Sequence, residues 1–164
     1  MERWHDLLAA QVAERPEAAA FSDSGGTAWS YAELSTAVEA VADNLRKVGV
    51  QPRDRVMVLS ENCCAAVAAM LGASRIGAIA VPVNARMSAG EVDRILSHAR
   101  PAAVLCTSAI SPEAAAHAAR LEAREISGAF GTLHLACLYA SNPDAPEEVA
   151  VLLYTTGTTG APKG

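Results

Sequence analysis

Two hydrophobic periodicities alternate along this chain, and their alternation limits the possible folds more than any other feature. Between Tyr31 and Val48 the apolar residues recur at helical spacing, which predicts one buried stripe on an amphipathic helix. Short apolar runs rich in Val, Leu and Ala are instead typical of buried strands, and three of them cover Asp54–Ser60, Ala78–Val83 and Ala102–Thr107. Strands that alternate with helices pair in parallel through right-handed crossovers. The sequence therefore predicts an α/β fold with a layered, mostly parallel sheet and flanking helices.

Capping residues mark the ends of the predicted helices. Two capping boxes, Ser30 with Glu33 and Ser88 with Glu91, each precede a helical stretch. Asn62 is predicted to cap the helix that lies between them in the sequence. The predicted helices cover residues 4–14, 31–48, 63–76, 89–99 and 112–123.

Further strand signals lie outside this central part. The runs "AAFSD" and "TAWSY" flank Ser24, Gly25 and Gly26, which predicts an N-terminal β-hairpin. The stretch "TLHLACLY" is predicted as a strand, although residues 124–138 show no clear pattern. A polar connector at 141–148 precedes a last predicted strand, Val149–Tyr154. Pro82 is expected to end its strand, because proline cannot serve a central ladder.

Length and charge exclude several classes of function. With 164 residues and 51% hydrophobic content the chain can bury one core, so a single domain is expected. Charged residues make up only 19% and the net charge is −5, which is unlike the basic surface that nucleic-acid binding requires. The N-terminus lacks the features of a secretory signal, and no apolar stretch is long enough to span a bilayer. We therefore expect a cytoplasmic protein with no nucleic-acid partner and no transmembrane segment.

The cysteines and histidines form no metal-binding pattern. They make no C-x-x-C pair and no H-x-x-x-H pair, so no metal site is predicted. We expect the cysteines to be reduced and packed as small apolar side chains, and each histidine to have a surface or helix-end role. No histidine is identified as a catalytic base. The residues concerned are Cys63, Cys64, Cys106 and Cys137, and His5, His98, His117 and His134.

The last ten residues combine four hydroxyls, three glycines and one ammonium. Glycines let the backbone bend so that several N–H groups face one anion, hydroxyls add donors, and lysine supplies a full positive charge. An apolar run leads directly into this loop, and ligands of open α/β sheets gather at the carboxyl ends of strands. The residues alone thus predict an anion-binding loop. Its candidate binding residues are Thr155, Thr156, Gly157, Thr158, Thr159, Gly160 and Lys163.

Two other interpretations of this loop are a P-loop and a flexible linker. A P-loop is excluded, because the fifth residue after Gly157 is Pro162, and Gly164 follows Lys163 where Ser or Thr is required. An ordinary Gly/Thr linker stays open on composition alone.

The stretch "LLYTTGTTGAPKG" resembles the signature loop of the AMP-forming, adenylate-forming enzymes. These include acyl-CoA and aryl-CoA synthetases, firefly luciferase and the adenylation domains of nonribosomal peptide synthetases. The usual form is YTSGTTGxPKG, and Thr156 replaces its Ser with another hydroxyl. The stretches "WSYAELSTAVEAVADNLRKVGV" and "GASRIGAIAVPVNARMS" are similar to the family's first and second core motifs. Asn84 favours the CoA ligases, because peptide synthetases tend to have an acidic residue there.

The resemblance, which covers nearly all of Trp29–Gly164, implies a two-step reaction. A carboxylic acid attacks the α-phosphate of ATP with the assistance of Mg²⁺, which gives an acyl-adenylate and pyrophosphate. A thiol, usually that of coenzyme A, then takes the acyl group. Residues Thr155–Gly160 and Lys163 would hold the β- and γ-phosphates.

Members of the family run several times longer than this chain. Residues 1–164 are therefore expected to be the N-terminal part of an AMP-binding domain, with the adenine and acyl pockets, the acidic metal ligand and the catalytic lysine beyond Gly164. By itself this part is expected to form no adenylates. Two alternatives stay open: a non-catalytic remnant that binds nucleotide weakly at most, and an aminoacyl-adenylating domain.

Overall fold

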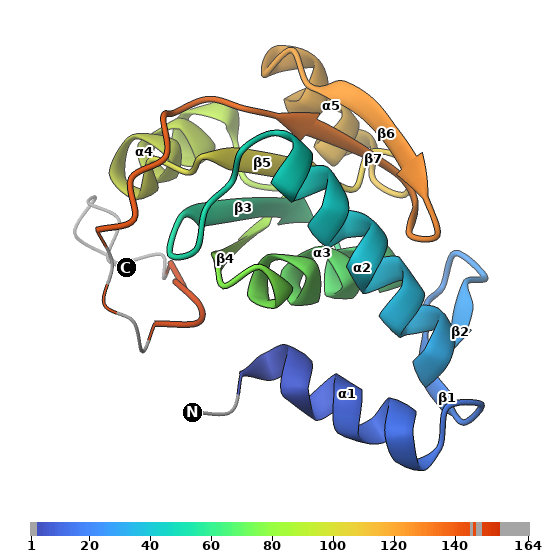
Figure 1. Ribbon diagram of the computed structural model, residues 1–164. Helices are drawn as coiled ribbons and strands as arrows, with labels where there is room; N and C mark the ends of the chain where they lie inside the picture. Colours follow the sequence, from blue (N-terminus) through green and yellow to red (C-terminus); the bar gives the residue numbers. More distant parts are fainter. Residues whose placement is uncertain (1–2, 145, 147–148, 155–164) are drawn as a thin grey trace.

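A central sheet with helices on both faces dominates the computed structural model, which describes residues 3–144, 146 and 149–154 (Figure 1). The described helices are α1 (Trp4–Glu14), α2 (Tyr31–Lys47), α3 (Cys64–Arg75), α4 (Ala89–Ala99) and α5 (Pro112–Arg120). The described strands are β1 (Ala19–Ser22), β2 (Ala28–Ser30), β3 (Arg55–Ser60), β4 (Ile79–Asn84), β5 (Ala103–Cys106), β6 (Arg124–Gly128) and β7 (Gly131–Ala136). The predicted α/β class is confirmed, and so is the predicted order of helices and strands from α1 to α5.

The sheet has the strand order β4-β3-β5-β7-β6 and is mixed. Strands β4, β3 and β5 are parallel, as predicted, whereas β7 runs antiparallel to β5 and forms a hairpin with β6. The hairpin falls in residues 124–138, where the sequence predicted only one strand. Its pattern is weak because β6 is an edge strand in which only Ile126 is buried, so the alternation that identifies a strand is reduced to a single residue.

Alternate residues of the parallel strands fill two separate cores. Val56 and Val58 of β3 face a core built with α2 and α3, while Met57 and Leu59 face a second core built with α4 and α5. All four side chains are fully buried. This period-two alternation into two apolar layers explains why the strands read as continuous hydrophobic runs.

The capping predictions were right for two helices and wrong for a third. Ser30 accepts a hydrogen bond from the N–H of Glu33 (3.2 Å), and Ser88 caps α4 with Glu91 in the same way. Asn62 does not cap α3, which begins one residue later than predicted. Instead the carboxylate of Asp23, in the turn of the β1–β2 hairpin, accepts the N–H of Cys64 at 2.9 Å. No local pattern could show this cap, because 41 residues separate the two partners.

Asp23 also accepts hydrogen bonds within its own turn, so its carboxylate links the β1–β2 hairpin to α3 in a way that depends on pH. Its Oδ1 accepts the N–H groups of Gly25 and Thr27 at 3.0 and 3.1 Å. The hydrogen bond from the Cys64 N–H is the largest cause that lowers the pKa of Asp23 below its ordinary value, with burial acting in the opposite direction. A carboxylate with a lowered pKa stabilises the fold above its unfolded pKa of about 3.9 and loses that contribution as the pH falls through the folded value.

We therefore expect Asp23→Ala to lower the free energy of unfolding more at pH 7 than at pH 3. Urea unfolding at both pH values measures the difference. Asp23→Asn keeps an acceptor but cannot titrate, so its effect should vary less with pH. An Asp23→Ala effect of equal size at pH 7 and pH 3 would contradict the assignment.

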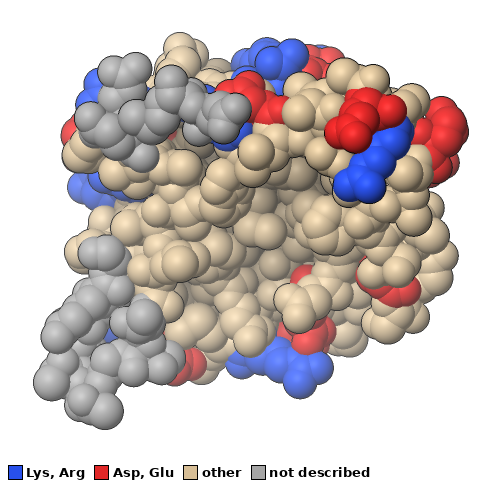
Figure 2. Space-filling view, turned by 90° about the horizontal axis from the view of Figure 1, so that it is seen from below, with Lys and Arg blue, Asp and Glu red and all other residues tan. Residues whose placement is uncertain are grey.

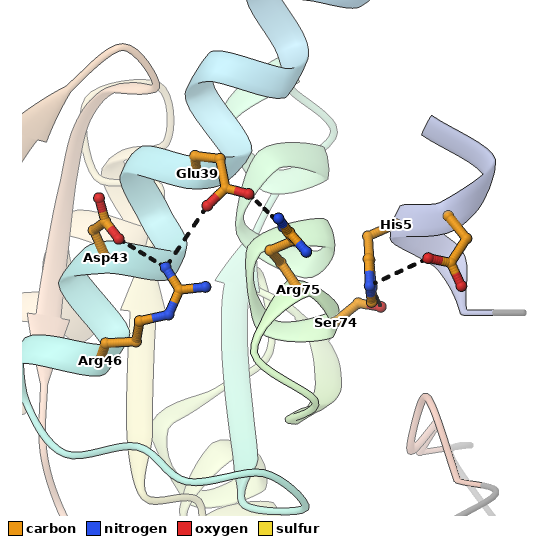
Figure 3. Close-up of polar contacts among 7 residues, drawn as sticks. His5, Glu39, Asp43, Arg46, Ser74 and Arg75 are labelled. Carbon is orange, nitrogen blue, oxygen red and sulfur yellow. Dashed lines mark hydrogen bonds and ion pairs between the residues drawn. The ribbon is translucent and has the colours of Figure 1, made fainter. Parts of the chain in front are cut away.

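Helix α1 lies outside the layer of α2 and α3 and is held there by apolar and polar contacts. Leu8 of α1 is buried in the first core. Figure 3 shows His5 beside Ser74 of α3, with a distance of 3.0 Å from Nδ1 to the hydroxyl oxygen. Burial lowers the pKa of His5, and the nearby carboxylate of Asp6 opposes this shift. The predicted helix-end role of His5 thus includes a long-range contact.

A second polar network joins α2 to α3 on the solvent side. Glu39 pairs with Arg75 of α3 and, at 3.7 Å, with Arg46, which also pairs with Asp43 at 2.7 Å (Figure 3). These side chains are half exposed, so the network contributes little stability compared with the apolar packing beneath it. Seen from below, on the side where α1 lies in Figure 1, charged side chains gather toward the rim of a largely uncharged face (Figure 2).

Candidate functional site

The loop predicted to bind phosphate lies outside the described residues. Thr155, Thr156, Gly157, Thr158, Thr159, Gly160 and Lys163 all fall in residues 155–164, so their anion-binding role stays a prediction. The structure does describe the segment that leads to them, Val149–Tyr154, and the contacts that hold it.

The leading segment is attached to the outer edge of β4. The N–H of Ala80 donates to the carbonyl of Ala150 (3.2 Å), and the N–H of Leu152 donates to the carbonyl of Ala80 (2.9 Å). These two bonds make one parallel bridge between Ala80 and Val151. The strand predicted over Val149–Tyr154 is therefore reduced to a single bridge. The segment still runs parallel to β4.

Pro82 explains why the pairing stops. Its register with Val58 places it inside β4, which continues to Asn84, so the prediction that Pro82 ends this strand was wrong. Residues 80 and 82 direct their backbone groups to the same side of β4, away from β3. Since proline has no N–H, the ladder to the leading segment lacks the donor that it would need after Ala80.

Side chains beyond the bridge anchor the segment on α4. Leu152 and Tyr154 pack against the second core, whereas Leu153 is exposed. The Tyr154 hydroxyl lies 2.6 Å from Nδ1 of His98, and the two rings meet edge to face with centroids 5.6 Å apart. Burial raises the pKa of Tyr154, so its hydroxyl stays protonated at neutral pH. His98 thus has the predicted helix-end position and a specific partner 56 residues away.

The connector before this segment is held at the amino end of β3. Asp54, which is 1% exposed, accepts hydrogen bonds from the Ser141 hydroxyl (2.9 Å) and the Asn142 N–H (2.8 Å). Arg55 pairs with Asp144 at 2.8 Å. The described part of the chain ahead of the loop therefore lies along the amino-terminal half of the sheet. That the loop itself lies at the carboxyl edge stays a prediction.

The carboxyl edge of the parallel strands presents three helix N-termini, and protein oxygens already cap each of them. The cap of α3 is Asp23, that of α4 is Ser88, and that of α5 is Ser111, whose hydroxyl accepts the N–H of Ala114 at 3.1 Å. At the same edge Arg86 pairs with the carboxylate of Glu61. A protein oxygen thus already accepts an N–H at each of these helix ends, and the phosphate-binding prediction rests on residues 155–164.

The cysteines show no reactive thiol among those that are buried. Burial raises the pKa of Cys64 to about 11 and that of Cys106 to about 12, so neither is a thiolate at neutral pH. Cys63 is buried as well, and its pKa is also raised by burial. Cys137 is exposed, which corrects the expectation that all four pack as apolar side chains.

The histidines are less peripheral than predicted. His117 is buried and its Nε2 lies 3.0 Å from the carbonyl oxygen of Met87. His134 of β7 lies 2.5 Å from the Ser108 hydroxyl. Both contacts join separate elements, so they serve the fold. Within the described ranges, no group of three or more His, Cys, Asp or Glu side chains could hold a metal ion.

No helix in the described part of the chain is long and apolar enough to cross a membrane.

Comparison with known proteins finds relatives that cover most of this chain. Feruloyl-CoA synthase from Amycolatopsis sp is 36% identical over 147 residues, which are 85% of this chain and 28% of that enzyme. Phenyloxazoline synthase MbtB from Mycobacterium sp. (strain MCS) is 34% identical over 160 residues, 98% of this chain and 13% of that protein. ATP-bound MatB from Rhodopseudomonas palustris superposes with a TM-score of 0.69 at 29% identity, covering 98% of this chain and 34% of that one. The chain therefore spans about a quarter of the first relative and less of the second.

The sequence profile of the AMP-binding enzymes matches residues 8–164, which include both core motifs and the terminal loop. The mixed sheet, its two helical layers and the N-terminal hairpin accompany that match over the described residues. The chain belongs to the family of AMP-binding enzymes.

Proposed function

We propose that this chain contributes the triphosphate-binding part of an ATP-dependent carboxylate–CoA ligase. The observation that carries the proposal is the family match through residue 164, because it includes the Gly/Thr loop and Lys163. Feruloyl-CoA synthase, an acid–thiol ligase by its name, supports the CoA branch. The neutral Asn84, whose Oδ1 accepts the N–H of Arg86 at 2.9 Å, is consistent with that branch.

The proposed chemistry divides into two displacements. A substrate carboxylate oxygen forms a bond to the α-phosphorus of ATP, and the bond to the bridging oxygen breaks, which releases pyrophosphate. The thiol of coenzyme A then releases its proton to solvent as its sulfur attacks the acyl carbon, the bond between the acyl carbon and the AMP oxygen breaks, and AMP leaves. The loop N–H groups, the threonine hydroxyls and Lys163 would stabilise the negative charge that grows on the departing pyrophosphate. Mg²⁺ would arrive with ATP.

Tyr154 and Asp54 have supporting roles in this proposal. The Tyr154–His98 contact and the Asp54 hydrogen bonds fix both ends of the stretch that precedes Thr155. A loop whose approach is fixed loses less conformational entropy when it closes on phosphate. An aminoacyl-adenylating activity is the second candidate, supported by the similarity to CymA of Salinispora arenicola (strain CNS-205), a probable nonribosomal peptide synthetase that is 33% identical over 163 residues.

We expect Lys163→Met to weaken the binding of inorganic pyrophosphate at least about tenfold. A hydrogen bond to a charged group contributes about 1.5–3 kcal/mol, and a factor of ten corresponds to about 1.4 kcal/mol. Isothermal titration of the chain with magnesium pyrophosphate measures the affinity.

The matched control is Lys47→Met, which removes the only other lysine from the exposed last turn of α2. It should leave the affinity unchanged. Equal losses in both variants would mean that only net charge matters, and no binding by the unmodified chain would refute the phosphate role in this chain. In a version of the protein extended by the rest of the AMP-binding domain, pyrophosphate–ATP exchange with added acids would then separate amino acid substrates from other carboxylic acids.

A further inference from the structure

An apolar groove lies between α1, the β1–β2 hairpin and the α2–α3 pair. It has a volume of about 370 Å³, and its lining includes Trp4 and Leu7 of α1, Phe21 of β1 and Met70 of α3. Trp4, Leu7 and Phe21 are 38%, 60% and 46% exposed, which is unusual for three large apolar side chains in one place. Small-molecule sites are concave, mostly apolar and typically about 300–1,000 Å³ in volume. The groove therefore has the size and lining of a ligand site.

The floor of the groove is buried, and its walls are held in place by other contacts. Leu8 and Leu34 line it and are 7% and 1% exposed, so its floor belongs to the first core. Its walls come from elements that other contacts hold, since His5 fixes α1 to Ser74 and Asp23 fixes the hairpin to α3. A shape that exists before the ligand arrives costs less entropy on binding. Figure 2 shows the side of the molecule on which α1 lies. The hollowed middle of this face is lined by uncharged residues.

One cation stands next to two of the lining residues. Arg15 follows α1, its Nε donates to Oε1 of Gln11 at 2.7 Å, and its guanidinium lies 5.5 Å from the ring centroid of Tyr31. Gln11 and Tyr31 both line the groove. Among the described residues no salt bridge involves Arg15, in contrast to Arg46, Arg55, Arg75, Arg86 and Arg120. The guanidinium keeps donors that can face a carboxylate.

We propose that this groove binds an amphipathic monocarboxylate, with its hydrocarbon part against Trp4, Leu7 and Phe21 and its carboxylate on Arg15. The apolar walls account for the hydrocarbon part of the ligand. The guanidinium, which has no salt bridge among the described residues, accounts for the choice of an anion over a neutral or cationic head group. The proposal is independent of the phosphate-binding role of residues 155–164, because none of them takes part in it.

Decanoate, used below its micelle concentration, is the probe. The chain has two tryptophans, so Trp29→Phe leaves Trp4 of the groove as the only indole reporter. We expect a saturable change in Trp4 emission with decanoate. Decyltrimethylammonium, which has the same chain length and the opposite charge, should bind at least about tenfold more weakly, since a charged hydrogen bond contributes 1.5–3 kcal/mol.

Two pairs of variants on this background test the parts of the site. Arg15→Gln should weaken decanoate about tenfold and leave decyltrimethylammonium unchanged, and Leu7→Ser should weaken both amphiphiles several-fold. Their controls are Arg124→Gln, on the exposed edge strand β6, and Ile110→Ser, 44% exposed outside the groove, which should change neither affinity. All four side chains are exposed, so folding should be intact, and circular dichroism checks it.

Several outcomes would overturn the proposal. Emission that does not saturate, equal affinity for both amphiphiles, or equal losses in the groove and control variants would each exclude a specific carboxylate site. Sedimentation velocity tests whether the groove is instead a contact between two copies of the chain. If the chain is a dimer that Leu7→Ser converts to a monomer, the groove is a contact between copies of the chain, and the ligand proposal fails.

Discussion

Replacing Gly72 by alanine is expected to lower the free energy of unfolding by about 1–3 kcal/mol, as overpacking of a core usually does. A Cβ at position 72 would lie 2.6 Å from Cγ1 and 2.8 Å from Cβ of Val41, and 3.2 Å from the carbonyl oxygen of Val38. Val41 is fully buried on α2, and its Cβ is fixed to the backbone. The clash can be relieved only if α2 and α3 separate, which loosens the first core.

The sign of this effect is informative, because alanine is the better helix former by about 0.8–1.0 kcal/mol. Gly90→Ala in α4 is the matched control: outside its chain neighbours and the backbone of its own helix, nothing lies within 4 Å of the added Cβ, so it should stabilise the protein or leave it unchanged. Urea unfolding of both variants measures the two effects. Val41→Ala removes the nearer contact, so in a double-mutant cycle it should reduce the cost of Gly72→Ala. Stabilisation by Gly72→Ala would show that the helices lie further apart than described.

Replacing Asp54 by alanine is expected to cost about 2–5 kcal/mol of unfolding free energy. The carboxylate accepts the N–H of Gln51 at 2.8 Å in addition to its bonds with Ser141 and Asn142. Without it, two backbone N–H groups and a hydroxyl at a nearly buried position lose their acceptor, and each unsatisfied group costs about 1–3 kcal/mol. Water entering the vacated space should recover part of this sum.

The same substitution should also free the connector that precedes Val149. Limited proteolysis followed by mass spectrometry should show earlier cleavage within residues 139–154 in Asp54→Ala than in the unmodified chain. Asp144→Ala is the control on the same connector, because Asp144 is exposed and its single salt bridge with the partly buried Arg55 should contribute less than the three hydrogen bonds of Asp54. Equal stability and equal cleavage in the two variants would remove Asp54 from its anchoring role.

The candidate site shows where reasoning from sequence stops. The loop residues could be recognised because their types and order are themselves the signal. The long-range contacts of Asp54, His98 and Tyr154 could not be recognised, since they join positions 56 to 88 residues apart, even though Tyr154 itself belongs to the signature stretch. The cap of α3 shows the same limit: Asn62 was the best local candidate, and a distant carboxylate took its place.

The fold divides in the same way. The sequence by itself determined the alternation of strands and helices, the parallel pairing of β3, β4 and β5, two capping boxes and the family, because periodicity, caps and motifs are local properties of neighbouring residues. Only the tertiary structure decided the antiparallel β6–β7 edge, the place of Pro82 within β4, the single bridge at Val151 and the groove beside α1. Those features depend on which backbone edges and side chains meet after the chain has folded, and no local pattern encodes such meetings.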